Sequence, residues 1–118
     1  MLFICYPNCT TCQKAKAWLD SQGIAYEMRN IKTHRPSEDE LRRWQKLSGL
    51  PLHKFVNTSG QSYRALGGKV IFDGMSENEK LAAFGADGML VKRPLLIDES
   101  FVLIGFKEDA WTRQLLQP

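Results

Sequence analysis

The sequence predicts an α/β fold, in which a small mixed sheet is flanked by helices. Three observations support this. A short apolar run, Leu2 to Tyr6, comes directly before a helix-like segment from Cys9 to Gln22. Two further apolar runs, 95–98 and 101–105, are joined by the two-residue connection Glu99-Ser100, as the strands of a hairpin are. Between these two regions, segments with helical spacing predominate.

The N-terminal elements form a strand-helix-strand unit. The first strand, 2–6, ends at Pro7, and its continuous apolar character indicates burial. The helix at 9–22 places Cys12, Ala15, Trp18 and Leu19 on one side, and Gly23 ends it. The run 24–31 is a second strand. We expect the two strands to be parallel because one helix connects them.

The middle of the chain contains two helix-start signals. Ser37 to Glu40 and Ser76 to Glu79 both have the capping-box spacing. After the first signal, Leu41, Trp44 and Leu47 follow at helical spacing up to Gly49. Positions 50–66 are predicted as a short helical turn, a loop around 57–60 and another short helix. The second capping box begins a helix that runs through Leu81 and Phe84 to a loop at 85–88.

The C-terminal elements complete the fold prediction. Arg93-Pro94 directly precedes the third strand, where a proline removes no ladder hydrogen bond. Ala110, Trp111, Leu115 and Leu116 predict a final helix whose apolar face covers the hairpin. The element order is that of a thioredoxin/glutaredoxin-like α/β core. We predict a single domain, 1–118, with a helical insertion at about 36–88. In thioredoxin-like proteins the proline before this strand is typically cis and faces the redox cysteine.

Composition restricts the function. The 118 residues are 43% hydrophobic, so the core needs no disulfide framework, and the three cysteines are an odd number. No signal-like N-terminus or bilayer-length apolar run is present, so we expect a cytoplasmic, thiol-reducing setting and no membrane partner. The net charge of +3 is mild and lacks a basic stripe with aromatics. Direct nucleic-acid binding is therefore not expected.

Cys9-Thr10-Thr11-Cys12 is the most informative motif. Two thiols at this spacing can close a disulfide or share a metal. At a strand-to-helix boundary, unpaired backbone amides favour the thiolate of the first cysteine, and Lys14 and Lys16 add positive charge. The motif therefore predicts a redox dithiol with Cys9 as the nucleophile and Cys12 as the resolving thiol.

Two metal-binding interpretations are alternatives to the redox dithiol. With Cys5, the spacing C-x3-C-x2-C matches the cluster-binding motif of radical enzymes that use S-adenosylmethionine, but those enzymes need a much longer barrel. Zinc would need His34 or His53 as a fourth ligand, and neither has ligand-like spacing. We expect no bound metal, and interpret Cys5 as a small core or pocket-lining residue.

Several segments together resemble the arsenate reductase and Spx family over nearly the whole chain: Tyr6 to Ala15, Asn57 to Gly60, Lys92 to Asp98, and Gly105 to Glu108. The resemblance implies that Cys9 is the nucleophile, and that its loop and helix N-terminus, with Thr10 and Thr11, cradle an oxyanion. It further implies that Arg93 holds an anionic substrate or a glutathione carboxylate, and that Pro94 shapes the wall opposite Cys9.

The resemblance also separates two activities. The glutaredoxin-linked reductases have three arginines for the oxyanion; Arg93 matches one, and Asn57 and Gly105 occupy the other two positions. We therefore expect weak arsenate reduction. The function implied is an arsenate reductase-like thiol-disulfide oxidoreductase without a bound cofactor, which uses glutathione or another thiol, glutaredoxin or thioredoxin. The alternative is a Spx-like regulator whose Cys9–Cys12 disulfide switches its binding to RNA polymerase.

Overall fold

The computed structural model describes residues 1–117, and four strands in this range form one mixed sheet in the order β2-β1-β3-β4. β1 (Leu2–Cys5) pairs in parallel with β2 (Glu27–Asn30). It pairs antiparallel with β3 (Leu95–Ile97), which continues into a hairpin with β4 (Val102–Ile104). The predicted parallel unit, the hairpin and the mixed sheet are confirmed.

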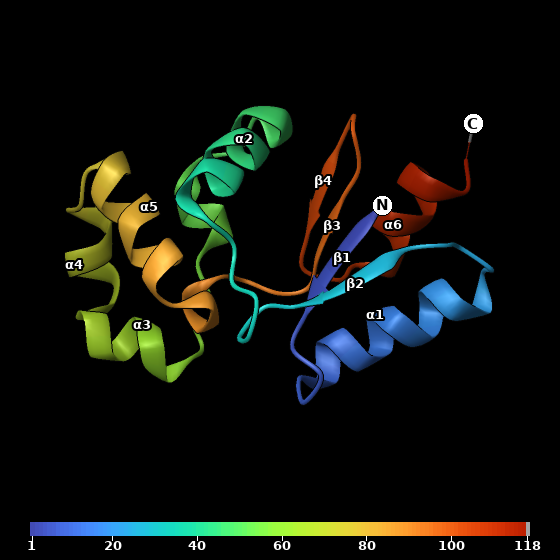
Figure 1. Cartoon of the computed structure of the whole chain (residues 1–118), viewed down its shortest axis with the longest axis horizontal. Helices are drawn as coiled ribbons and strands as arrows, with labels where there is room; N and C mark the ends of the chain where they lie inside the picture. Colours follow the sequence, from blue (N-terminus) through green and yellow to red (C-terminus); the bar gives the residue numbers. More distant parts are fainter. Residues whose placement is uncertain (118) are drawn as a thin grey trace.

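One face of the sheet is covered by α1 (Thr10–Ser21) and α6 (Glu108–Leu115) (Figure 1). Phe3 of β1 and Leu96 of β3 are buried on this side with Trp18 and Trp111. The Trp111 ring lies 6.4 Å from the ring of Phe3 and 6.3 Å from that of Trp18, both in edge-to-face geometry. The final helix therefore covers the hairpin as predicted.

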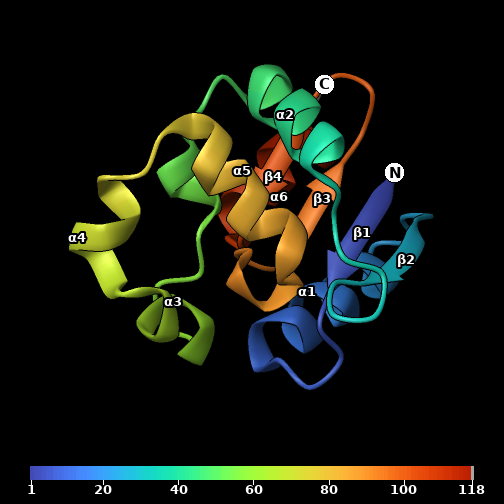
Figure 2. The same cartoon turned by 60° about the vertical axis from the view of Figure 1, so that its left-hand side comes forward.

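The helical insertion between β2 and β3 packs against the opposite face. It comprises α2 (Glu38–Ser48), η1 (Leu52–Phe55), α3 (Gln61–Leu66), α4 (Gly68–Asp73), α5 (Glu77–Ala86) and η2 (Gly88–Leu90). Ile4, Leu95 and Ile97 of the sheet are buried in one cluster with Leu41 and Trp44 of α2. In Figure 1, α3, α4 and α5 gather on the side away from α6, and Figure 2 shows α5 in front of the sheet with α3 and α4 beside it.

Sequence reasoning misjudged parts of this insertion. α4 was not predicted, because its six residues are too few for a periodic signal and bury only Phe72. The loop expected at 85–88 is wrong: α5 continues to Ala86 despite Gly85, and a short 3-10 turn begins at Gly88. Leu47 follows the apolar spacing of α2 yet is 39% exposed. Both capping boxes are present as predicted.

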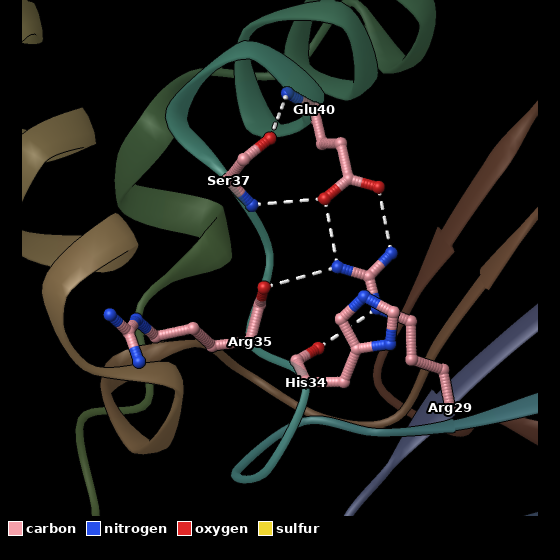
Figure 3. A network of polar contacts seen from close by, with 5 residues as sticks. All are labelled: Arg29, His34, Arg35, Ser37 and Glu40. Atoms are coloured by element: carbon pink, nitrogen blue, oxygen red, sulfur yellow. Dashed lines mark hydrogen bonds and ion pairs between the residues drawn. The ribbon is translucent and has the colours of Figure 1, made fainter.

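A half-buried ion pair joins the sheet to the insertion (Figure 3). The guanidinium of Arg29 in β2 donates to both carboxylate oxygens of Glu40 in α2, at 2.7 and 2.8 Å. It also donates to the carbonyls of His34 and Arg35, at 2.9 and 3.1 Å. Glu40 in turn accepts the amide of Ser37 at 2.9 Å. These contacts, the Arg29 pair first, lower the pKa of Glu40 from 4.5 to about 2.

None of the helices in the described part of the chain has the length and apolar character that crossing a membrane requires.

Candidate active site

Cys9 is the N-cap residue of α1. Its backbone is extended, with φ −85° and ψ 124°, and its carbonyl accepts the first helical bond, from the Gln13 amide at 3.0 Å. Its own amide donates to the Tyr6 carbonyl at 2.9 Å, which closes the turn between β1 and α1. The half-buried thiol makes no cap hydrogen bond. It therefore lies beside the unpaired first-turn amides, as the sequence predicted.

The sheet topology brings distant segments to this cysteine. Ile4 of β1 pairs with Leu95 of β3, so the end of β1 lies beside the start of β3. Leu95 also pairs with Ile104, which brings the end of β4 to the same edge. The insertion reaches this edge through the Phe55 carbonyl, which accepts the amide of Lys92, just before β3, at 2.7 Å.

These segments enclose a cleft of about 410 Å³. The residues that line it are Cys9, Thr11, Asn57, Ser59, Gly60, Lys92, Arg93, Ile104, Gly105, Phe106 and Lys107. Four of the residues predicted for the site, Cys9, Thr11, Asn57 and Arg93, thus meet around one space. The cleft joins the core to the insertion, because Asn57 to Gly60 come from the insertion and the other residues from the core.

Three predicted site residues do not line this cleft. Thr10 is exposed at the start of α1. Pro94 is buried; the bond between Arg93 and Pro94 is cis, as expected for this fold, and the Pro94 carbonyl accepts the Gly105 amide at 2.8 Å. Cys12 lies on the inner side of α1 and is 2% exposed.

Lysines contribute charge that sequence reasoning missed. Lys92, Arg93 and Lys107 all line the cleft, and its lining within the described residues includes no Asp or Glu. Sequence reasoning identified Arg93 as a cation of the site but did not identify these two lysines. The signal was available, because Lys92 and Lys107 lie in two of the segments that carry the family resemblance. The cleft attracts anions because its unpaired positive charges are not balanced by carboxylates.

Arg93 is oriented by its neighbours. Its Nη1 donates to the Met89 carbonyl at 3.2 Å, and its Cζ lies 5.6 Å from the centre of the Tyr6 ring. Its Nε is buried and has no hydrogen-bond partner within the described residues. A fixed guanidinium beside the cleft suits a carboxylate or another oxyanion.

Gly105 has a conformational role. Its φ is +69°, in the left-handed region, and a Cβ at this position would lie 3.2 Å from Lys92 Cε. Its carbonyl accepts the indole N–H of Trp111 at 3.1 Å. An arginine at position 105 would be strained in this backbone.

The three cysteines form a chain of interacting thiols, and all are free. Cys12 Sγ accepts the Tyr6 amide at 3.3 Å and interacts with the thiols of both Cys5 and Cys9. Its hydrogen bond with Cys5, followed by burial, raises the pKa of Cys12. The same hydrogen bond lowers the pKa of Cys5, and the charge of Lys16 lowers it further. Cys12 is therefore a protonated donor in this reduced state.

Within the described residues, no group of three or more His, Cys, Asp and Glu side chains is arranged to hold a metal ion.

Comparisons with known proteins agree with this architecture. A family model described as the ArsC family matches residues 5–114. The uncharacterized protein YusI of Bacillus subtilis is 47% identical over 109 residues, which cover 92% of each chain. The global transcriptional regulator Spx of Staphylococcus haemolyticus is 31% identical over 92% of this chain and 82% of its own.

A solved structure from Streptococcus mutans, described as a possible arsenate reductase, matches with a TM-score of 0.83 and 46% identity over 90% of both chains. The predicted thioredoxin/glutaredoxin-like core with its helical insertion is confirmed by the sheet order and by such structural matches.

Proposed function

The chain belongs to the ArsC family, and from this premise we propose that it is a thiol-disulfide oxidoreductase in which Cys9 attacks an anionic disulfide. One observation carries the proposal: the half-buried thiol of Cys9 shares a cleft with Lys92, Arg93 and Lys107. The thiolate is the nucleophile in such exchange, and the position of Cys9 at the N-terminus of α1 leaves its thiol accessible from the cleft.

The chemistry is a two-step exchange. The Cys9 thiolate attacks one sulfur of the substrate disulfide, forms a mixed disulfide and releases the first thiol. Cys12 then attacks Cys9 Sγ, closes an intramolecular disulfide and releases the second thiol. Because Cys12 is a protonated donor at rest, its proton must leave as it attacks, and the departing thiolate of the substrate is the acceptor at hand.

Oxidised glutathione represents the proposed class of anionic disulfide substrates. Its carboxylates suit a cleft with three cationic side chains, and Ile104 and Phe106 add apolar contact. Asn57 supplies hydrogen bonds but no charge where the reductases have an arginine, so we propose disulfide exchange as the main reaction, with weak arsenate reduction. Glutaredoxin or thioredoxin in a cytoplasmic, thiol-reducing setting would return the dithiol to its reduced state.

A single-turnover comparison tests this function. Reduced protein is mixed with oxidised glutathione or with the neutral bis(2-hydroxyethyl) disulfide, and thiol release is followed after rapid quenching. Cys9→Ser should abolish both reactions. Lys107→Ala should slow the reaction of the anionic substrate severalfold and that of the neutral one little, whereas Lys46→Ala, at an exposed position of α2 that does not line the cleft, should change neither. Equal effects of Lys107→Ala on both disulfides would contradict a charge-based selection.

A redox-dependent regulator is the second candidate function, which the similarity to Spx over most of the chain favours. Under this hypothesis the Cys9–Cys12 disulfide alters a surface that binds RNA polymerase. A pull-down of RNA polymerase with reduced and oxidised protein tests it. Redox-dependent capture together with slow disulfide turnover would favour the regulator, and turnover without capture would favour the enzyme.

A further inference from the structure

A second, smaller cavity lies on the other side of the α1 N-terminus from the thiol of Cys9. Its volume is about 140 Å³, and it is lined by Cys5, Pro7, Cys12, Gln13, Lys16 and Met28. None of these six residues lines the basic cleft. Cys12 therefore connects two spaces: it interacts with Cys9 at the cleft and shares the second cavity with Cys5.

We propose that Cys5 is a second resolving thiol, which displaces Cys9 from Cys12 and leaves a Cys5–Cys12 disulfide at the second cavity. The inference rests on the proposed function, because it begins from a Cys9–Cys12 disulfide. It assigns a chemical role to a cysteine that packing alone would explain.

The fold holds Cys5 and Cys12 together. Cys5 is the last residue of β1 and Cys12 lies in the first turn of α1, and both are buried in the cluster between the sheet and this helix. The Tyr6 amide, next to Cys5 in the chain, donates to Cys12 Sγ at 3.3 Å. Cys5 and Cys12 therefore lie at the same cavity, as the proposed exchange requires.

Lys16 is the cation beside Cys5, and it lines the same cavity as Cys5 and Cys12. In the reduced protein the pKa of Cys5 is lowered by its interaction with Cys12 and, less strongly, by the charge of Lys16, while burial raises it. The contribution of Cys12 ends when Cys12 enters a disulfide, and Lys16 then remains as the positive charge near the Cys5 thiol.

The exchange is balanced without an outside oxidant. The Cys5 thiolate attacks Cys12 Sγ, the bond between Cys9 and Cys12 breaks, and Cys9 leaves as a thiolate that takes up the proton lost by Cys5. Cys5 is oxidised and Cys9 is reduced, so the step transfers the disulfide without net oxidation. Over the whole sequence, one substrate disulfide becomes two thiols, and the protein keeps one disulfide and one free Cys9 thiol.

The transfer of the disulfide from the Cys9–Cys12 pair to the Cys5–Cys12 pair, called the relay below, has a measurable consequence. Because Cys9 is free again, an excess of oxidised glutathione should convert it to a second mixed disulfide that has no resolving thiol. Intact mass spectrometry of the full chain should then show one glutathionyl group in addition to one internal disulfide. Without the relay, Cys9 stays locked to Cys12 and no stable adduct forms.

Fragment ions identify the disulfide. All three cysteines lie in the tryptic peptide Met1 to Lys14, so tandem spectra must assign them individually. After acid quenching, free thiols are alkylated in denaturant, disulfides are reduced, and the released thiols take a second label. At one equivalent of oxidised glutathione, wild-type protein should have the first label on Cys9 and the second on Cys5 and Cys12.

Cys5→Ala and Cys5→Ser are the matched variants. Both should stop at the Cys9–Cys12 disulfide and form no stable glutathionyl adduct, while the initial rate of attack by Cys9 is unchanged. If neither variant folds, the label pattern of the wild-type protein decides alone. A final wild-type disulfide between Cys9 and Cys12, with Cys5 in the first-label fraction, would overturn the relay. Unchanged attack in Cys9→Ser would instead overturn the proposed function.

Discussion

Replacing Glu40 by glutamine should weaken the joint between the sheet and the insertion in a pH-dependent manner. The variant keeps an amide oxygen for the Ser37 N–H, because glutamine also serves in a capping box. It removes the negative charge that pairs with the Arg29 guanidinium at 2.7 and 2.8 Å. The Arg29 side chain is only 9% exposed, so its charge is left with carbonyl partners in a poorly solvated place.

The lowered pKa of Glu40 gives the size of the expected loss of stability. A fall from 4.5 in the unfolded chain to about 2 in the fold corresponds to about 3 kcal/mol, at about 1.4 kcal/mol per tenfold change in proton affinity. The carboxylate side chain is 23% exposed, and solvent screening reduces the expected effect to about 2 kcal/mol. Because the folded-state pKa is the lower one, this stability is present above pH 4.5 and is lost as the pH falls toward about 2.

Urea unfolding, followed by tryptophan fluorescence, measures the free energy of unfolding, since Trp18, Trp44 and Trp111 are all buried. Glu40→Gln should be less stable than wild type by about 2 kcal/mol at pH 7, and this difference should shrink as the pH falls from 4.5 to about 2. Glu79→Gln is the control, because Glu79 occupies the other capping box without an arginine. A difference between wild type and Glu40→Gln that stays constant with pH, or an equal loss in Glu79→Gln, would refute the ion-pair reasoning.

Further predictions concern the site. In the native reduced protein, iodoacetamide should label Cys9 well before Cys5, because the Cys9 thiol is half-buried and Cys5 is 3% exposed; equal labelling rates would remove the case for an accessible nucleophile. The rate with oxidised glutathione should fall as salt is raised from 10 to 150 mM, the range over which the Debye length drops from about 30 to about 8 Å, whereas the rate with a neutral disulfide should change little. Gly105→Ala should lower the free energy of unfolding by about 1–3 kcal/mol through its positive φ and the contact with Lys92. Gly23→Ala has a similar φ and open space around it, so its smaller loss isolates the contribution of the contact.

Local signals determined the parts of the fold that were predicted correctly. Ser37 and Ser76 began their helices where the capping boxes placed them, because each motif satisfies backbone amides within its own first turn. The extent of α5 was misjudged, because Gly85 was taken to end a helix that continues through it. Gly85 lies against Glu38 of α2, where a Cβ would meet the glutamate Cγ at 3.0 Å, so it serves close packing between helices. Such a tertiary reason is invisible in a window of sequence.

The candidate site likewise contains residues that local sequence predicts and residues that only the packed fold brings together. Cys9 was predicted from its position between a strand and a helix, which is a local property. Lys107 lines the cleft because β3 pairs with β4, which brings the segment after β4 to the same edge of the sheet as Cys9. The proximity of Cys5 to Cys12 depends on how α1 packs on β1, because a strand residue and a helix residue seven positions apart have no fixed separation. Spacing alone therefore suggested the Cys9–Cys12 disulfide, whereas the packing of α1 on β1 is the basis of the proposed Cys5–Cys12 disulfide.

The cleft combines two parts of the molecule that serve different ends. The core supplies the nucleophile and the three cations, whereas the insertion supplies the wall from Asn57 to Gly60. That wall is held by backbone contacts: the bridge between Val56 and Val91, and the amide of Lys92, which donates to the Phe55 carbonyl at 2.7 Å. Changes in the insertion can therefore alter which substrate fits without disturbing Cys9.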